Sequence, residues 1–454
     1  MANKDLLTYN AKVTQVEQDY FAPVASVVGT TTPVSTLYCF MSRVLPWPND
    51  IDPPQPTQDQ KSLKQIYKNI FAVKKINSSG ISPVIQRIDW DSGEVYDYYQ
   101  DDIDMFATNP SGTLVKRFYI RNRYDQVFKC LWNNNDSAST DEPFFQPGTY
   151  GINNIYKGAD GYKWKYMYTI DVGRKTTFMD SSWMPVPVVK TAPTPNDTSA
   201  GYGDIEVINV VNGGSGYDPA NSVVTLTITG DGTGTTGTIS TSNGVITDIV
   251  VTNPGSNYTF ANVSVSSAAG SNATFIAPVS PVGGHGYDSV TELGCSHVMV
   301  TAQFNGDEGG LIPTDIDFRQ VGLLVNPTAL STYPNPANGT IYKTSTDFVV
   351  APGFGTYSPD EVVYQGTSEA TATFTGTVLS FDVGSNVLRL INTTGTQTLN
   401  APIFGASSLT ARTVLSVSTP DFITFSGFMT YIENRESVQR SSDGIEQFKF
   451  VLGY

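Results

Sequence analysis

The chain has 454 residues, of which 39% are hydrophobic and 15% charged, and its formal net charge is -15. A chain of this length can bury more than one hydrophobic core, so we expect several domains. The acidic balance argues against nucleic acids and anionic membranes as partners, because both repel a negatively charged surface. Its 40 glycines and 27 prolines lie among Ser-, Thr-, Asn- and Val-rich stretches, which favour short strands and turns. We therefore predict a mainly β fold.

Residues 1–199 carry most of the aromatic and charged residues and are predicted to form the first part of the protein's core. The clearest helix is predicted from Thr57 to about Lys74, because apolar residues recur there at helical spacing. Thr57 and Gln60 fit a capping box, and the prolines just before Thr57 prevent an earlier start. We expect this helix to pack one face on a sheet.

A polar stretch punctuated by prolines ends this segment, and residues 200–282 are predicted to form an inserted β domain rich in Gly and Thr. Within it, residues 208–217 and 249–258 repeat with an offset of 41 positions. Each copy is a β-branched strand that turns at Gly-rich residues and is followed by Tyr. We expect the two copies to pack together, and residues 283–350 to return to the core.

A second segment of low charge, residues 351–416, is predicted to be another inserted β domain, either a small barrel or a sandwich. Residues 417–454 then complete the core. The predicted architecture is a multi-layer β-sandwich with an α+β core, a few helices and two inserted small β domains.

Two strands are predicted in the last core segment. The first covers residues 422–432 and runs into a charged turn. The second covers residues 445–452, where Ile445, Phe448 and Phe450 supply the apolar positions. We expect this terminal strand to dock in a sheet.

The cysteines Cys39, Cys130 and Cys295 are far apart in the sequence. They form neither a disulfide framework nor a C-x-x-C metal clamp, so we expect buried free thiols. The N-terminus has no cationic segment followed by an apolar one, and no run of about 18 uncharged apolar residues occurs. We therefore expect the protein to be made and kept in the cytosol until it is assembled.

Residues 232–237, GTGTTG, spell the G-x-G-x-x-G pattern of dinucleotide-binding loops. A β-rich run follows them to Val251, where a nucleotide fold would place a helix whose N-terminus receives the pyrophosphate. Gly/Thr repeats also produce this string easily. We therefore predict no nucleotide site and no cofactor.

One acidic region begins like a calcium loop. Asp89 and Asp91 fit the first ligand positions, but Gly93 and Gln100 stand where such a loop needs further ligands. A weaker calcium site made by these aspartates and the DDID cluster at residues 101–104 stays open. The alternative is a solvated acidic turn.

The cluster of Asp101, Asp102 and Asp104 also offers carboxylates of the kind that flank a glycosidic bond in hydrolases. Acidic clusters are expected by number alone, however, in a chain with 42 Asp and Glu residues. His285 and His297 are the only histidines, and His285 lies in a Gly-rich turn with no Ser or Cys nucleophile motif such as G-x-S-x-G beside it. We therefore predict that the protein is not an enzyme, and that alanine variants of the cluster lose no activity on polysaccharide.

The nearest feature to a basic stripe comprises Lys116, Arg117, Arg121 and Arg123. Their period-2 spacing predicts that these side chains lie on solvated strand faces. The alternative is that the stripe meets an acidic surface of a partner.

Five short segments give the chain a resemblance to a known family. They read YCFMSRVLPW at residues 38–47, QRIDW at 86–90, DGYKWKYMYTI at 160–170, FRQVGLLVNP at 318–327 and GFMTYIENR at 427–435. In this order they resemble the gene-product-eight family, the baseplate wedge subunits of T-even-type contractile-tail bacteriophages. The matches omit residues 201–282 and 351–416, so the resemblance says nothing of their roles.

This resemblance implies a non-enzymatic, β-rich subunit that forms a homodimer and binds neighbouring baseplate wedge proteins. It implies no cofactor, no nucleic acid, no membrane and no small-molecule substrate. The protein would reside in the virion, in the tail baseplate, after assembly in the host cytoplasm. The baseplate would change state on infection through rigid subunits that move past one another.

We expect partners to contact large aromatic and charged residues in the matching segments. For Trp90 and Trp164, a core role is the alternative. For Trp47, which stands between two prolines in a loop-like stretch, the alternative is local packing. The candidate interface residues are Trp47, Trp90, Trp164, Tyr431 and Arg435.

The alternative function is a receptor-binding or fibre-like tail protein that contacts host surface glycans. Such a protein would use the Gly/Thr/Asn-rich repeats of residues 201–282 for this contact, and it would be trimeric. The oligomeric state therefore separates the two functions.

Overall fold

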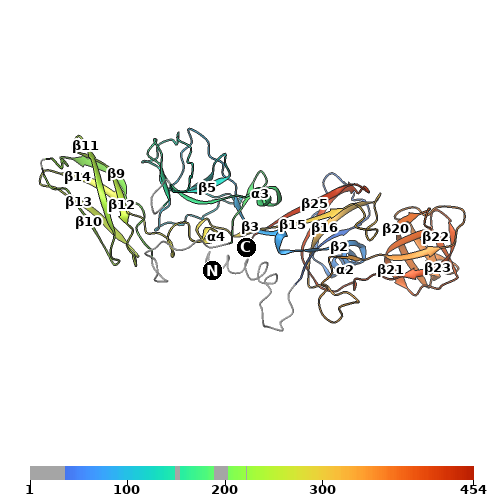
Figure 1. Cartoon of the computed structure of the whole chain (residues 1–454). Helices are drawn as coiled ribbons and strands as arrows, with labels where there is room; N and C mark the ends of the chain where they lie inside the picture. Colours follow the sequence, from blue (N-terminus) through green and yellow to red (C-terminus); the bar gives the residue numbers. More distant parts are fainter. Residues whose placement is uncertain (1–35, 149–153, 189–202, 221, 454) are drawn as a thin grey trace, which may run out of the picture. The chain divides into compact units, whose positions relative to one another are not determined.

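The chain folds into two compact β-rich units. Strands hold 44% of the residues and helices 7%, which confirms the predicted mainly β fold. None of the described helices is long and apolar enough to cross a membrane. The computed structural model describes residues 36–148, 154–188, 203–220 and 222–453 (Figure 1).

The two units do not follow the predicted segment boundaries. Among the described residues, the first unit holds Ser82–Met299 and residues 451–453, and the second holds residues 36–81 and Val300–Phe450. Where the structure describes the chain, each passage between the units falls inside a strand.

A four-stranded antiparallel sheet with the order β4-β5-β7-β6 forms the centre of the first unit. Phe128 and Trp164 pack with other aromatic residues in one cluster, while Tyr119 and Val127 belong to a second cluster. The alternation of side chains along a strand places these clusters on opposite faces of the sheet. The strands are β4 (Tyr119–Arg121), β5 (Gln126–Trp132), β6 (Ile155–Lys157) and β7 (Lys163–Thr169).

Short elements complete this unit. The two helices that the structure describes in this unit each begin after an aspartate, Asp171 or Asp288, whose carboxylate accepts a hydrogen bond from a backbone N–H of the first turn. Strand β3 pairs antiparallel with β8. These elements are β3 (Ile81–Gln86), α3 (Val172–Phe178), β8 (Trp183–Pro185) and α4 (Ser289–Glu292).

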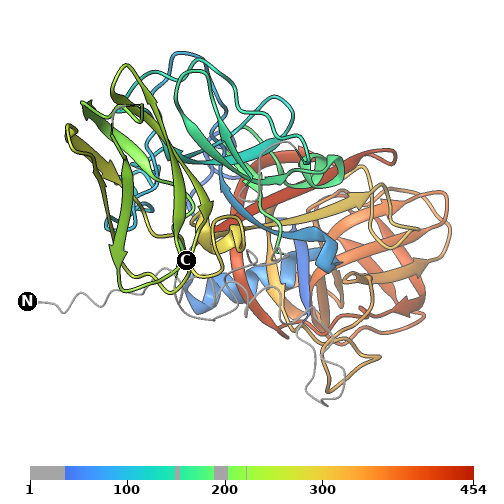
Figure 2. The ribbon, with the colours of Figure 1, turned by 60° about the vertical axis from the view of Figure 1, so that its left-hand side comes forward.

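The Gly/Thr-rich insert, residues 203–282, also belongs to the first unit (green to yellow in Figures 1 and 2). Its six strands form three antiparallel ladders, β9–β14, β11–β12 and β10–β13. The last strand of each three-strand half therefore pairs with the first strand of the other half. The strands are β9 (Asn209–Ser215), β10 (Thr225–Gly230), β11 (Thr236–Ser242), β12 (Val245–Asn253), β13 (Ala261–Ser266) and β14 (Ser271–Ile276).

The repeats contact each other reciprocally. The N–H of Tyr217 donates to the carbonyl of Gly244 at 2.9 Å, and the N–H of Tyr258 donates to the carbonyl of Gly203 at 3.0 Å. Both donors and both acceptors are related by the sequence offset of the repeat. Both tyrosines are 3% exposed and share one core. This confirms that the two copies pack together, and the glycine pattern at residues 232–237 leads into strand β11.

The second unit contains a five-stranded sheet with the order β17-β2-β1-β16-β24. Helix α2 contributes Ile66 to a core that also holds Phe40 and Leu324 from the sheet. The helix thus covers a sheet face, as predicted. The bounds are β1 (Leu37–Ser42), α2 (Gln60–Asn69), β2 (Ile70–Ile76), the short 3-10 turn η2 (Ser78–Gly80), β16 (Asp317–Val325), β17 (Ile341–Lys343) and β24 (Phe428–Gln439).

Helix α2 is shorter than predicted at both ends. Its N-cap is Asp59, not Thr57, and the Asp59 carboxylate accepts from the N–H groups of Lys61 and Ser62. The helix ends at Asn69 because residues 70–76 pair with β1 as a strand. An apolar run at helical spacing also fits a strand that is buried on both faces, and tertiary pairing decided the outcome.

The C-terminal strands differ from the prediction. Strand β24 begins at Phe428, not Phe422, and continues to Gln439, so the charged residues predicted as a turn lie inside the strand. In β25 (Ile445–Gly453), Phe448 and Phe450 are buried, but Ile445 is 66% exposed. Phe448 packs on Phe304 of β15 (His297–Asn305), which builds a second β layer in this unit.

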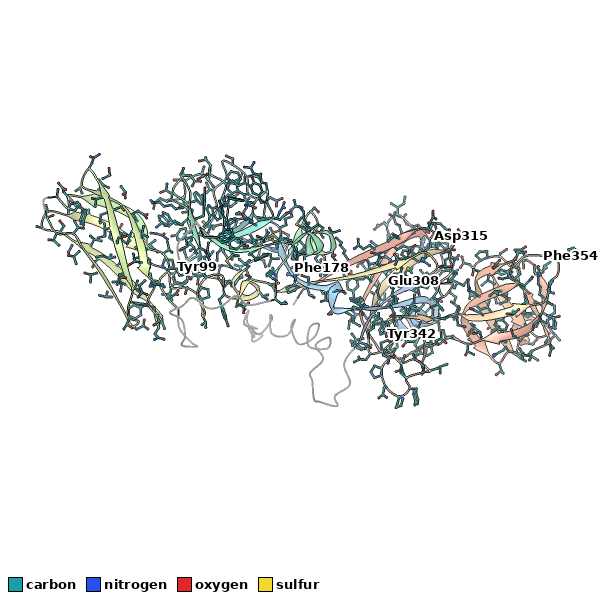
Figure 3. All side chains as sticks on the ribbon, in the orientation of Figure 1. Tyr99, Phe178, Glu308, Asp315, Tyr342 and Phe354 are labelled. Carbon is teal, nitrogen blue, oxygen red and sulfur yellow. The ribbon has the colours of Figure 1, made fainter. Side chains whose placement is uncertain are left out.

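Residues 346–418 form a closed six-stranded barrel (orange in Figures 1 and 2). Phe348 and Phe374 lie in its own hydrophobic core, whereas Phe354 is 99% exposed (Figure 3). The barrel begins slightly before and ends slightly after the predicted segment. Its elements are β18 (Thr346–Val350), β19 (Val362–Gln365), η3 (Glu369–Thr371), β20 (Phe374–Asp382), β21 (Val387–Gly395), β22 (Pro402–Gly405) and β23 (Ala411–Ser418).

Candidate functional site

Three of the candidate interface residues meet at the edge strand of the second unit. Trp47 follows β1 in a loop, and its indole N–H donates to the carbonyl of Arg435 at 2.9 Å. The Arg435 guanidinium pairs with Glu433 at 3.0 Å, and the Tyr431 hydroxyl donates to Glu433 at 3.3 Å. Trp47, Tyr431 and Arg435 are all partly exposed. They form one partly exposed surface on β24.

A groove of about 410 Å3 lies beside this surface. Residues 428–432 of β24 line one wall, and Pro56, Gln58 and Leu63 line the other. Alternate side chains of a strand point to opposite faces of its sheet. A groove on one face would therefore contact every second residue, whereas a groove along the edge of the strand can contact five consecutive residues. Strand β24 ends its sheet, and Phe428 is 69% exposed. An edge with these features can accept an added strand from a protein partner.

The other two candidates belong to the aromatic core of the first unit. Trp164 is fully buried in β7, where its ring stacks on Tyr162 at 5.4 Å and meets the edge of Tyr96. It therefore has the core role that the sequence left as the alternative. Trp90 is partly exposed at the border of this cluster, and its indole N–H donates to Ser139 at 3.0 Å.

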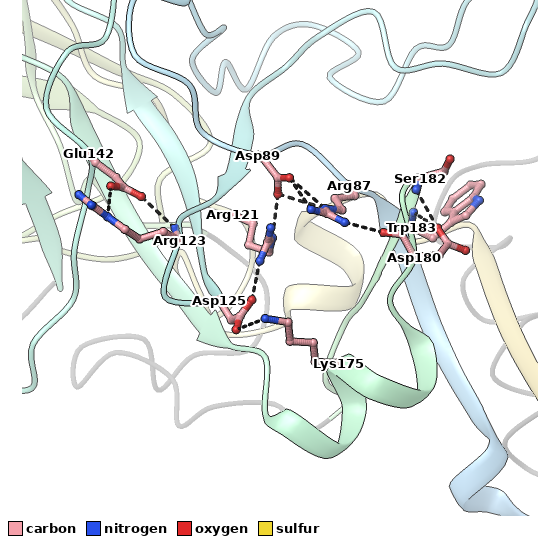
Figure 4. Close-up of polar contacts among 10 residues, drawn as sticks. All are labelled: Arg87, Asp89, Arg121, Arg123, Asp125, Glu142, Lys175, Asp180, Ser182 and Trp183. Atoms are coloured by element: carbon pink, nitrogen blue, oxygen red, sulfur yellow. Dashed lines mark hydrogen bonds and ion pairs between the residues drawn. The ribbon is translucent and has the colours of Figure 1, made fainter.

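The residues predicted as a basic stripe are paired with carboxylates. Arg121 pairs with Asp89 at 2.8 Å and also with Asp125, which accepts from Lys175 (Figure 4). Only Arg121 lies in a strand, so the prediction of strand faces is wrong for the other three, which occupy the loops around β4. The remaining pairs are Lys116 with Asp97, Arg117 with Glu94 and Arg123 with Glu142.

The aspartates proposed for calcium or hydrolysis are engaged separately. Burial raises the pKa of Asp89, but hydrogen bonds from Arg87 and Arg121 outweigh it and lower the pKa overall. The Asp101 carboxylate accepts from the N–H of Val279 at 3.2 Å, and Asp104 accepts from the N–H of Phe106 at 3.0 Å. In the part of the chain that the structure describes, no three His, Cys, Asp or Glu side chains are grouped to hold a metal ion.

The most unusual polar site was not predicted. Four lysines, which we call the lysine face, lie on one face of the sheet in the first unit. Lys129 of β5 is the register partner of Lys165 of β7, and Lys157 of β6 is the partner of Lys163 of β7. Like charges directly opposite each other destabilise a sheet, so this face needs compensating anions.

Three carboxylates provide this compensation. Glu206, in the insert before β9, binds Lys165 at 2.6 Å. Asp248 in β12 binds Lys157 at 2.7 Å and Lys163 at 3.2 Å. Glu292 in α4 binds Lys129 at 3.2 Å. Lys129, Lys163 and Lys165 are buried by these contacts, whereas the Lys157 side chain is 49% exposed.

The turn that follows the insert donates backbone hydrogen bonds to two of these carboxylates, Glu206 and Glu292. The N–H of His285 donates to Glu206 at 2.5 Å, and the N–H of Gly286 donates to Glu292 at 2.7 Å. Lys129 lies 3.9 Å from the centre of the Tyr99 ring, which Figure 3 labels. Glu206 and Glu292 therefore each bind one lysine and at least one backbone donor of the turn.

These residues gave only a weak sequence signal. Lys163 and Lys165 alternate with aromatic residues in a strand, which indicates one polar face, and that face is exposed in most antiparallel sheets. Their partner Glu206 is 41 positions from Lys165, and Glu292 is 163 positions from Lys129. No local pattern connects such distant residues.

Comparison with known proteins provides no assignment. No protein-family model matches the chain, and no curated protein sequence matches it.

Proposed function

We propose that the protein is a structural, non-enzymatic subunit of the baseplate wedge of a contractile-tail bacteriophage. In this role it forms a homodimer, joins neighbouring wedge proteins during assembly and takes part in the conformational change of the baseplate on infection. It acts in the tail baseplate of the virion after assembly in the host cytoplasm. The role requires no cofactor, nucleic acid, membrane or small-molecule substrate.

The positions of the segments that carry the resemblance support this proposal. Segments 38–47, 318–327 and 427–435 contribute to β1, β16 and β24, which are adjacent strands. Phe40, Gly322 and Ile432 lie side by side across these strands. Segments that are scattered in the sequence are therefore neighbours in one sheet, as a shared scaffold requires.

Local packing explains part of the shared pattern. A Cβ atom at Gly322 would lie 2.5 Å from the Phe40 ring and 2.3 Å from the Tyr431 carbonyl oxygen. Only glycine fits at this position, where three adjacent strands lie side by side. The first and last segments also meet through the hydrogen bond from Trp47 to Arg435. The matched residues thus act in packing, which supports a structural role.

The open edge of β24 supports a role in protein assembly. Its groove, the exposed Phe428 and the partly exposed Trp47 form a surface of the kind that anchors protein partners. The open edge is also a hazard of unwanted association, which the charged residues Glu433, Arg435 and Glu436 limit.

Light scattering behind size exclusion on the full chain tests this proposal. The expected mass is twice 49.1 kDa, the mass of one chain. A stable trimer would contradict it and favour a receptor-binding or fibre-like protein that contacts host glycans. Cross-linking within isolated baseplates then tests the partners, and cross-links from β24 to another wedge protein or to a second copy are expected.

A further inference from the structure

The insert meets the lysine face at both of its ends and in its middle. Glu206 lies at its start, Asp248 lies in β12, and the turn at His285 with Glu292 follows its end. Three carboxylates thus face four lysines in a mostly buried contact, which we call the insert root. The charges in this contact hold the insert on the sheet.

His285 lies at the centre of the insert root and is 3% exposed. Its Nδ1 is 3.1 Å from the Lys129 ammonium and 3.7 Å from the Glu292 carboxylate. The Tyr99 ring meets it edge-on at 5.0 Å. Glu206 and Lys165 are the other charged groups that act on the imidazole.

This geometry holds His285 in its neutral form. A lysine ammonium can only donate, so Nδ1 of His285 accepts and the ring proton is on Nε2. Nε2 is buried and has no hydrogen-bond partner among the described residues. A second proton on Nδ1 would place two cations in contact in a buried site. Burial, followed by the charge of Lys129, accordingly lowers the pKa of His285 well below its ordinary value.

We propose that the insert root is a pH-sensitive latch, in which His285 stays neutral while the insert is docked and becomes protonated when the contact opens. Acidification therefore releases the insert from the lysine face. The proposal concerns the first unit alone and does not depend on the baseplate assignment.

Proton linkage determines how the equilibrium between the docked and the open state changes with pH. The docked state binds no second proton at His285, whereas the released imidazole has its ordinary pKa of about 6.5. Below about pH 6.5 the open state binds more protons, so the opening equilibrium rises roughly fivefold between about pH 6.5 and 5.5 and approaches roughly tenfold per pH unit at lower pH. Well above that pH the released imidazole is also neutral, so protonation of His285 no longer favours the open state.

Asp248 acts in the same direction at lower pH. Burial raises the pKa of its carboxyl, but Lys163 and Lys157 outweigh burial and lower the pKa overall. Its contribution is therefore present above the ordinary aspartate pKa of about 3.9 and is lost as the pH falls further. Protonation of Asp248 removes the anion that binds Lys157 and Lys163, so it also weakens the contact.

Hydrogen–deuterium exchange of the full chain, measured by mass spectrometry and corrected for intrinsic rates, tests the latch. Between about pH 6.5 and pH 5.5, we expect peptides from residues 203–212 and 283–292 to lose roughly fivefold in protection. Peptides from β20 and β21 of the barrel should keep theirs. An equal loss in both sets, or no loss at the root, would overturn the proposal.

Two matched histidine variants identify the sensor, since the chain has only two histidines. In His285→Asn, the amide oxygen can still accept from Lys129 but cannot be protonated, so the pH dependence of root exchange should disappear. His297→Asn should keep the full dependence. A wild-type slope in His285→Asn would refute the sensor.

A variant that leaves the histidine in place keeps the proposal testable if His285→Asn does not fold. Glu206→Gln removes the anion from the buried Lys165, and at about pH 7.5 it should raise root exchange at least tenfold relative to the barrel peptides. Root exchange equal to that of the unaltered chain would contradict the latch.

Discussion

The insert and the barrel are both small β modules, but they are stabilised in different ways. The barrel closes its six strands on themselves, and Phe348, Phe374 and Leu388 are at most 2% exposed in its own core. The insert has three separate two-stranded ladders, and much of its apolar core is partly exposed. Closure removes strand edges, so the barrel holds itself together, whereas the insert depends on charges at its root.

The contacts with the neighbouring sheets show the same difference. The barrel contacts its sheet through Arg43, whose guanidinium binds both oxygens of Asp360 at 2.7 and 2.8 Å. Asp360 is 30% exposed, so water can replace part of this pair. At the insert root, Lys165 and Glu206 are at most 5% exposed. Loss of one partner there leaves a buried charge without compensation.

Truncation in the barrel core should have the largest effect. Phe374 packs against Phe348 at 5.3 Å and is 2% exposed. Phe374→Ala should lower the free energy of unfolding by about 3–5 kcal/mol, because it removes buried apolar surface and leaves a cavity. Chemical denaturation monitored together with exchange of barrel peptides measures this. Unchanged protection of the barrel would contradict a self-contained core.

Removal of one buried lysine at the insert root should cost nearly as much. Lys165→Met leaves Glu206 buried without its cation and should destabilise the first unit by about 3 kcal/mol. The matched control is Lys157→Met, whose side chain is 49% exposed and whose loss should cost less than about 1 kcal/mol. Chemical denaturation measures both variants. An equal loss of unfolding free energy in the two would contradict the idea that the buried pair contributes more than the exposed pair.

The barrel contact should be weaker than the insert root. Asp360→Asn removes the charge that Arg43 binds and should cost about 1–2 kcal/mol after allowance for the partial exposure of Asp360. The barrel peptides should keep their exchange protection, because the barrel core is untouched. Loss of protection throughout the barrel would show that this module also depends on its attachment.

Substitution at the edge of β24 should change association and leave stability nearly unaltered. Phe428 is 69% exposed, so Phe428→Asp should change the free energy of unfolding by less than about 0.5 kcal/mol. If the groove binds partners, the same variant should weaken cross-linking in baseplates. Phe354→Asp, on the barrel, is the control, since Phe354 is 99% exposed away from the groove residues. Equal cross-linking in both variants would exclude the groove.

Part of the fold could be predicted from local patterns. The helical spacing before Asn69 identified α2, and the recurring glycine–tyrosine strings identified the two halves of the insert. The free thiols of the three cysteines are buried, as expected. Each of these properties depends on neighbours within a few positions or on composition, which a sequence displays directly.

The candidate site could be predicted only in part. Trp47, Tyr431 and Arg435 were selected separately, and β24 brings them together. Trp164 could not be assigned to surface or core, because its burial depends on Tyr96 and Tyr162. The extent of α2 was missed for a similar reason, since β1 recruits residues 70–76 as a strand.

By itself, the sequence determined the β-rich class, the position of the main helix, the repeated insert and the absence of a disulfide framework. Tertiary structure alone decided that Lys129 and Lys165 are buried and that β24 forms an open edge. The physical reason is that a charge can be buried only beside its counter-charge, and Glu292 is 163 positions away from Lys129. Such pairs form when strands and loops that are distant in the sequence pack together.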